Sequence, residues 1–93
     1  MSVHELRSQA ARTDTGVMLQ TVDRDTMRVD YAGHVMHVPV ERGLEGYGFY
    51  FPPVPTWDDE EPVSVPDLSV VKAAIVEIQQ HWGFGADFHV LEV

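Results

Sequence analysis

One stretch of the chain, residues 64–83, carries a full set of helix signals and so limits what the rest can fold into. Its apolar residues recur at spacings of three and four, which places them on one side of a helix. These residues are Leu68, Val71, Ile75, Ile78 and Trp82. Ser64, three residues before Asp67, is typical of a capped N-terminus, and Gly83 stands where a helix commonly ends. The sequence therefore predicts one long amphipathic helix.

The other apolar residues follow strand patterns. Residues 27–31 alternate apolar and charged side chains, as in a half-buried strand. Asp30 and Gly33 fit the first and fourth positions of a turn that leads into the next strand. The predicted strands are residues 16–22, 27–31, 34–40, 47–51 and 86–91.

The predicted order of elements is therefore β-β-β-β-α-β. A helix about 27 Å long, at 1.5 Å per residue, would cover one face of a mostly antiparallel sheet of about four to five strands. This is a two-layer α+β fold. We expect residues 16–93 to form one such domain.

Residues 1–15 are polar and lack a sustained apolar face. Ser2 and Glu5 have the spacing of a capping box for a short helix through Ala11. Disorder is an equal alternative, because chain termini are often poorly ordered. We expect an N-terminal extension of one of these two kinds.

Charge is unevenly distributed along the chain. The net charge is −9; residues 1–42 hold six acids and five bases, whereas residues 43–93 hold nine acids and only Lys72. Such a surface repels phosphate, which disfavours nucleic acids and anionic membranes as partners. A basic protein partner is favoured, because complementary charge speeds encounter and selects partners. The alternative is that the acidity only keeps the protein soluble.

The composition also bears on the cellular compartment. The chain has no cysteine, which excludes disulfide bonds and thiolate chemistry. Its first residues lack a basic region followed by an apolar stretch, so no signal peptide is predicted. No apolar run approaches the roughly 18 residues of a membrane helix. We expect a cytoplasmic protein.

Catalytic and metal-binding patterns are weak. His34 and His37 are three residues apart in a predicted strand, so they point to opposite faces and cannot share an ion. The other histidines are scattered, and a metal site needs three or four convergent ligands. The chain has no nucleophile elbow, Walker loop or dinucleotide fingerprint. We expect no enzyme activity, no metal and no cofactor.

The acidic stretch after the aromatic strand is the candidate binding site. Exposed tryptophans often anchor interfaces, and a charged rim steers the partner. The alternative, favoured for the tryptophan, is burial at the end of the core, because large aromatic residues in small domains are mostly buried. The candidate partner-binding residues are Trp57, Asp58, Asp59, Glu60, Glu61 and, in the preceding loop, Glu45.

The order of these signals from residue 27 to residue 91 resembles a bacterial family, immunity protein 74 of polymorphic toxin systems. The resemblance includes the strand-turn-strand of residues 28–35, the aromatic strand of residues 48–51, Trp57 with the acidic residues 58–62, and the helix that opens at Val63 and Ser64. It implies an antitoxin-like protein that binds and neutralises a cognate toxin. Residues 1–15 have no place in this pattern.

Two other functions remain open from the sequence. One is a structural or regulatory domain that forms a homodimer through an exposed strand edge. The other is a small enzyme or ligand carrier, which requires a pocket joining histidines to carboxylates.

Overall fold

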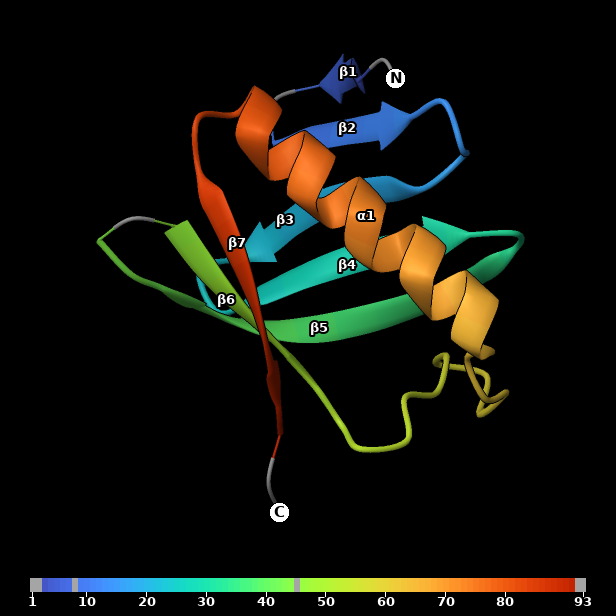
Figure 1. Ribbon diagram of the computed structural model, residues 1–93. Coiled ribbons are helices and arrows are strands. Elements are labelled where there is room, and N and C mark those ends of the chain that lie inside the picture. Colours follow the sequence, from blue (N-terminus) through green and yellow to red (C-terminus); the bar gives the residue numbers. More distant parts are fainter. Residues whose placement is uncertain (1–2, 8, 45, 92–93) are drawn as a thin grey trace.

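The computed structural model describes residues 3–7, 9–44 and 46–91 and shows an α+β fold (Figure 1). Within these residues, one mostly antiparallel sheet of seven strands is covered by one helix. The strands are β1 (Val3–Arg7), β2 (Ala10–Thr13), β3 (Met18–Asp23), β4 (Thr26–Tyr31), β5 (His34–Arg42), β6 (Gly46–Phe51) and β7 (Gly85–Val90), and the helix is α1 (Val65–His81). The predicted order of four strands, helix and strand is present, with two more strands at the N-terminus. Among the described residues, no helix has the length and apolar character that a membrane crossing requires.

The strands lie in the sheet in the order in which they occur in the chain. Each strand from β2 to β6 pairs antiparallel with the one before it. β7 instead pairs parallel with β6, and a parallel pair needs a connection that crosses back over the sheet. The helix α1 lies in that connection and therefore covers one face of the sheet, as Figure 1 shows.

The first fifteen residues differ from the prediction. Residues 3–7 and 10–13 form strands rather than a helix or a disordered segment, and Ser2 of the expected capping box lies outside the described residues. The reason is tertiary: β2 pairs with β3, and Ala10, Ala11 and Thr13 are at most 1% exposed. Two alanines and a threonine give little periodic signal, so the pattern of the sequence does not reveal this burial.

The core lies between α1 and the inner face of the sheet. Val71, Ile75 and Ile78, three members of the predicted stripe, are fully buried. Leu68 and Trp82, at its two ends, are only partly buried against the core. The sheet contributes eight further large buried side chains: Leu19, Met27, Val29, Met36, Val38, Val40, Phe49 and Phe51.

Both predicted ends of the helix are confirmed. The hydroxyl of Ser64 accepts a hydrogen bond from the backbone N–H of Asp67 at 3.2 Å. At the other end Gly83 has φ +87°, a left-handed conformation that costs glycine little. This turn lets the N–H of Phe84 donate to the carbonyl of Gln79 at 2.8 Å, which completes a Schellman cap.

The junction of β6 and β7 depends on close backbone contact. Gly46 faces Gly85 across the parallel pair, and a Cβ on Gly46 would stand 2.2 Å from the carbonyl oxygen of Gly85. A Cβ on Gly48 would meet side-chain atoms, the ring of His89 at 3.1 Å and the ring of Tyr50 at 3.7 Å. Gly46 is therefore needed for the strand spacing, whereas a side chain can yield at Gly48.

We expect Gly46→Ala to lower the free energy of unfolding by about 2 kcal/mol or more, because it forces two backbones apart. The matched variant Gly48→Ala should cost about 1 kcal/mol or less, since the imidazole of His89 can rotate away. Urea unfolding followed by circular dichroism measures both. Equal losses in the two variants would contradict this account.

Candidate functional site

The predicted site lies in a hydrogen-bonded turn between β6 and α1, here called the acidic loop (residues 55–63). The N–H of Trp57 donates to the carbonyl of Glu61 at 2.8 Å, and the N–H of Glu60 donates to the carbonyl of Trp57 at 2.9 Å. The N–H of Val63 donates to the carbonyl of Pro55 at 3.0 Å and closes the base of the loop. Glu60 has φ +70°, the left-handed conformation that this kind of turn requires. The acidic loop is thus a defined turn.

Trp57 belongs to the core. It is 3% exposed, and its ring stacks on the ring of His34 with centroids 5.4 Å apart. This confirms burial, the favoured alternative for Trp57. The indole holds the loop against the end of the sheet and is not an exposed anchor for a partner.

The two aspartates of the loop bind the two histidines of β5. The N–H of Asp58 donates to the carbonyl of Val35 at 2.7 Å, which places the loop along the edge of β5. Nδ1 of His37 lies 2.6 Å from Oδ2 of Asp58. Nδ1 of His34 lies 2.8 Å from Oδ2 of Asp59. Because an ionised carboxylate only accepts, each histidine is the donor.

His34 and His37 are three residues apart in β5, so their side chains leave opposite faces of the strand, as predicted. Neighbouring aspartates reach around the strand edge and bind one histidine on each face. The pairs are half-exposed, with exposed fractions of 35% and 53% for His34 and Asp59. Their main effect is to hold the loop in place, because exposed ion pairs contribute little stability.

The pKa of Asp59 is lowered from its ordinary value of 3.8. The larger cause is the backbone N–H of Glu61, which donates to Oδ1 of Asp59 at 3.1 Å, and the second is the hydrogen bond from His34. Both favour the ionised carboxylate. The turn is therefore built around a charged Asp59.

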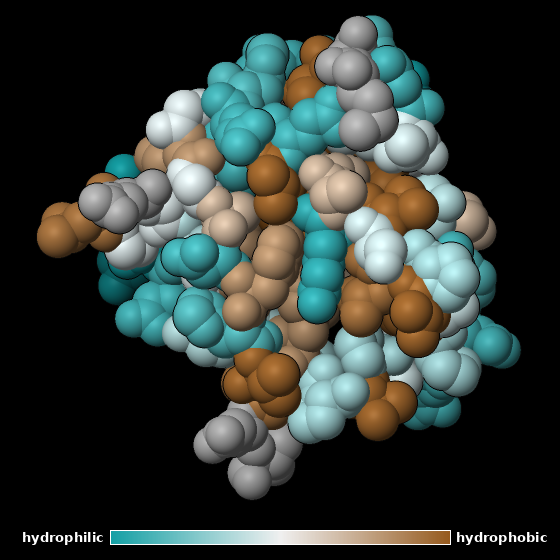
Figure 2. Space-filling model, in the orientation of Figure 1, coloured by the Kyte–Doolittle hydropathy of each residue, from teal (hydrophilic) through white to brown (hydrophobic). Residues whose placement is uncertain are grey.

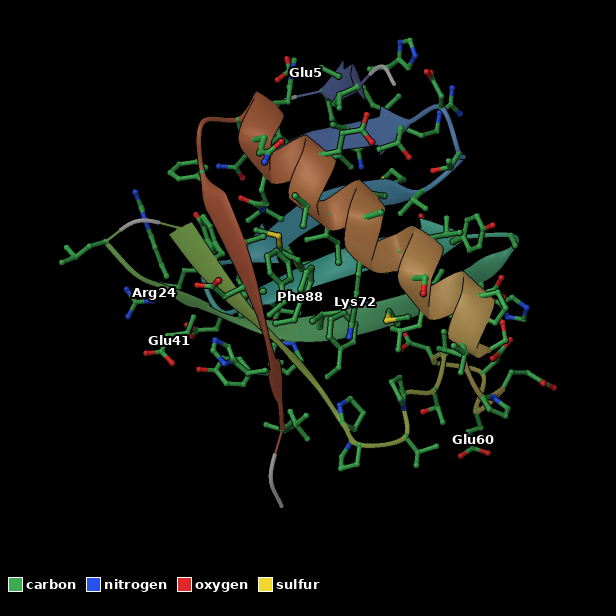
Figure 3. All side chains as sticks on the ribbon, in the orientation of Figure 1. Glu5, Arg24, Glu41, Glu60, Lys72 and Phe88 are labelled. Atoms are coloured by element: carbon green, nitrogen blue, oxygen red, sulfur yellow. The ribbon has the colours of Figure 1, made fainter. Side chains whose placement is uncertain are left out.

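The remaining acids of the candidate site face solvent. Glu60 and Glu61 are exposed, and Figure 3 shows Glu60 on the outside of the loop, pointing away from the sheet and the helix. Among the described residues, the ion pairs give the carboxylates of the acidic loop only histidine partners and no lysine or arginine. Glu45, the sixth predicted residue, lies outside the described residues.

A second cluster, which the sequence pattern does not reveal, lies on the outer face of β5, β6 and β7. The hydroxyl of Tyr50 donates to Oε2 of Glu41 at 2.8 Å, and this bond raises the pKa of Tyr50 above its ordinary value of 10.0. The ring of Tyr50 stacks on His89 with centroids 5.1 Å apart. With Asp87 and Gly48, these residues line a shallow cavity of about 780 Å³. They come from three strands, so only strand register brings them together.

A second cavity, of about 660 Å³, lies near the C-terminal end of α1. Gln79 on its wall is fully buried, which no pattern in the sequence indicates. Its Nε2 contacts Sδ of Met27 at 3.6 Å, and its Oε1 has no hydrogen-bond partner among the described residues. Trp82, at the mouth, donates from its indole N–H to Oε1 of Glu5 at 3.2 Å.

The described histidines and carboxylates do not gather into one group. Within the described parts of the chain, no three metal-ligating side chains lie together in a way that could hold an ion. Histidines and carboxylates instead meet in pairs, as in the two histidine–aspartate pairs of the acidic loop.

Comparisons of the chain with protein-family models, curated proteins and solved structures found no match. The resemblance to the immunity protein 74 family therefore stays a prediction.

We expect Trp57→Ala to lower the free energy of unfolding by about 3–5 kcal/mol, because it empties a buried aromatic site. Trp57→Phe should lose less than half of that amount, since it keeps most of the buried area. Chemical unfolding monitored by circular dichroism gives both values. An alanine variant within about 0.5 kcal/mol of the wild type would place Trp57 outside the core.

The lowered pKa of Asp59 makes its contribution depend on pH. The stabilisation is fully present above pH 3.8, the ordinary value, and is lost as the pH falls through the lower pKa of the folded state. The wild type should therefore be more stable than Asp59→Asn at pH 7, and the difference should shrink below pH 3.8. Thermal unfolding from pH 7 to pH 2 tests this, and a difference that stays constant over that range would contradict it.

Proposed function

We propose that this protein is a binding module that engages a basic protein through the acidic loop. The observation that carries the proposal is a set of adjacent carboxylates on a defined turn, whose ion-pair partners among the described residues are histidines alone. Most carboxylates at protein surfaces are free to reorient. Here the turn holds the backbone of residues 57–61 in one arrangement before any partner arrives.

Preorganisation matters because binding normally costs the entropy of ordering side chains and loops. The hydrogen bonds from His34 and His37 fix two of the carboxylates, and the buried ring of Trp57 fixes the base of the loop. Glu60 and Glu61 extend beyond them into solvent. A lysine-rich or arginine-rich surface would meet this negative region at little ordering cost, and complementary charge would speed the encounter.

The specific form of the proposal is an immunity protein that neutralises a cognate bacterial toxin by direct binding. The resemblance of residues 27–91 supports this form, and the acidity of residues 43–93 suits a toxin with a basic substrate-binding cleft. The absence of cysteine fits a reducing compartment such as the cytoplasm. A homodimer is the weaker alternative, because two copies with a net charge of −9 repel each other.

The test uses the protein products of the genes adjacent to this one, above all a toxin domain of a large secreted protein. Binding to the purified chain is measured by isothermal titration calorimetry. We expect Glu60→Gln combined with Glu61→Gln to weaken the complex about tenfold and to reduce its dependence on salt.

The matched control is Asp25→Asn combined with Glu77→Gln, which removes the same charge from the β3–β4 turn and from α1. It should leave the affinity within about twofold, because only charges at the contact are desolvated and paired. Equal weakening by the two double variants would show that net charge, and not the acidic loop, attracts the partner.

A further inference from the structure

The two edge strands of the sheet differ in how they are protected against pairing with another chain. β1 is an edge whose register shifts between Glu5 and Arg7, and both of these side chains are exposed. Irregularity and charge are the usual means by which proteins block an edge. β7, the other edge, pairs with β6 in an unbroken register from Gly85 to Val90 and contains neither proline nor lysine. β7 therefore lacks the register shift of β1, and Asp87 is its one acidic residue.

The register shows which backbone groups of β7 face outward. The N–H of Leu91 donates to the carbonyl of Phe51, so Leu91 directs its backbone groups toward β6. Successive residues of a strand direct their backbone N–H and C=O groups to opposite edges. The N–H and C=O of Ala86, Phe88 and Val90 therefore lie on the outer edge. In the part of the chain that the structure describes, no strand pairs with this edge.

The surroundings of the edge differ on its two faces. On the outer face the wall is acidic, with Asp87 on β7 and Glu41 in the same row of the sheet, separated by Gly48, which has no side chain. On the inner face Ala86 and Val76 of α1 also line the cavity of about 780 Å³, which therefore has residues from both faces of β7 in its wall.

The inner face also carries the one lysine of the chain. Nζ of Lys72 lies 5.5 Å from the ring centroid of Phe88 and 5.6 Å from that of Phe51, and Figure 3 shows Lys72 and Phe88 close together beside β7. A cation held on aromatic rings repels a second cation. The inner face therefore favours apolar side chains, and the outer face favours basic ones.

Apolar surface continues past the end of the edge. Val90 is 63% exposed and Leu91 is 37% exposed. Figure 2 shows brown, apolar surface in the part of the molecule where β7 ends. An added strand would cover these side chains as well as satisfy the free backbone groups.

We propose that the outer edge of β7 binds an extended segment of a partner protein by adding it to the sheet as an eighth strand. The segment alternates basic residues, which face Asp87 and Glu41, with apolar residues, which face Ala86 and Phe88. Backbone hydrogen bonds to Ala86, Phe88 and Val90 supply affinity, and the alternation supplies specificity. The basic character of the partner rests on the proposed function, whereas addition at the edge rests on β7 alone.

A partner segment is favoured over a second copy of the chain because of charge. Two copies would bring their Asp87 side chains and a net charge of −9 each against one another, which opposes association. A basic segment reverses the sign of that interaction and turns it into attraction.

The probe is a fluorescent eight-residue peptide of alternating valine and arginine, titrated into the full chain at physiological salt and read by fluorescence polarisation. Two further peptides carry N-methyl groups either on all the valines or on all the arginines. All residues of one kind direct their N–H groups to the same edge of a strand, so one methylated peptide should lose at least about tenfold in affinity while the other binds as before. Equal binding of both, or no saturable binding of the parent peptide, overturns the proposal.

The protein variants are Val90→Pro and its matched control Val90→Thr. Proline removes an N–H that faces outward and leaves the hydrogen bonds to β6 intact, whereas threonine keeps that N–H. We expect binding of the peptide to fall at least about tenfold in Val90→Pro and less than about threefold in Val90→Thr. Unchanged circular dichroism would confirm that both variants fold. In the wild type, the peptide should slow the hydrogen exchange of the backbone amides of Ala86, Phe88 and Val90. Binding of the peptide without slower exchange of these amides would contradict its addition to the edge of β7.

The outcomes separate this proposal from the acidic-loop proposal. If the double variant Glu60→Gln with Glu61→Gln loses peptide binding and Val90→Pro does not, the peptide binds at the acidic loop. This result would overturn the proposal that it binds at the edge of β7. If a valine–glutamate peptide binds as tightly as the valine–arginine peptide, binding at the edge of β7 is supported. The proposal that the partner is basic is then overturned. A concentration-dependent dimer in analytical ultracentrifugation that Val90→Pro abolishes would assign the edge to a second copy and overturn a foreign segment.

Discussion

Burial of the apolar stripe of α1 against the inner face of the sheet is the interaction on which the other features depend. Val71, Ile75 and Ile78 exclude water from this layer. The crossing of α1 over the sheet places β7 parallel to β6 as an edge strand. The connection between β6 and β7 also contains the acidic loop, which precedes α1.

The two surfaces would bind a partner through different interactions. The acidic loop presents charge on a turn that is held by Trp57 below and by His34 and His37 at the sides. The edge of β7 presents unpaired backbone groups between an acidic wall and an apolar wall. The first would act by long-range attraction and the second by short-range pairing. Charge brings partners together, and backbone pairing with buried side chains holds them.

Prediction from the sequence succeeded where the signal is local and failed where it depends on distant residues. The helix and both of its caps were predicted, because Ser64, Asp67 and Gly83 act on backbone groups a few residues away. The strands β1 and β2 were missed, because the burial of Ala10 and Ala11 comes from pairing with β3 and packing under α1. Within the candidate site the residues of the loop were found, but not that Asp58 and Asp59 bind the histidines of β5.

The sequence by itself determined the α+β class, the single amphipathic helix and the concentration of acids after residue 43, because periodicity, capping and charge can be read along the chain. Only the tertiary structure decided that Asp58 and Asp59 bind the histidines of β5, that Glu41, Tyr50 and His89 are neighbours, and that β7 ends the sheet with an open edge. The physical reason is that strand order and register join residues tens of positions apart. The pairing that makes those contacts is selected by burial of the whole core rather than by any local pattern.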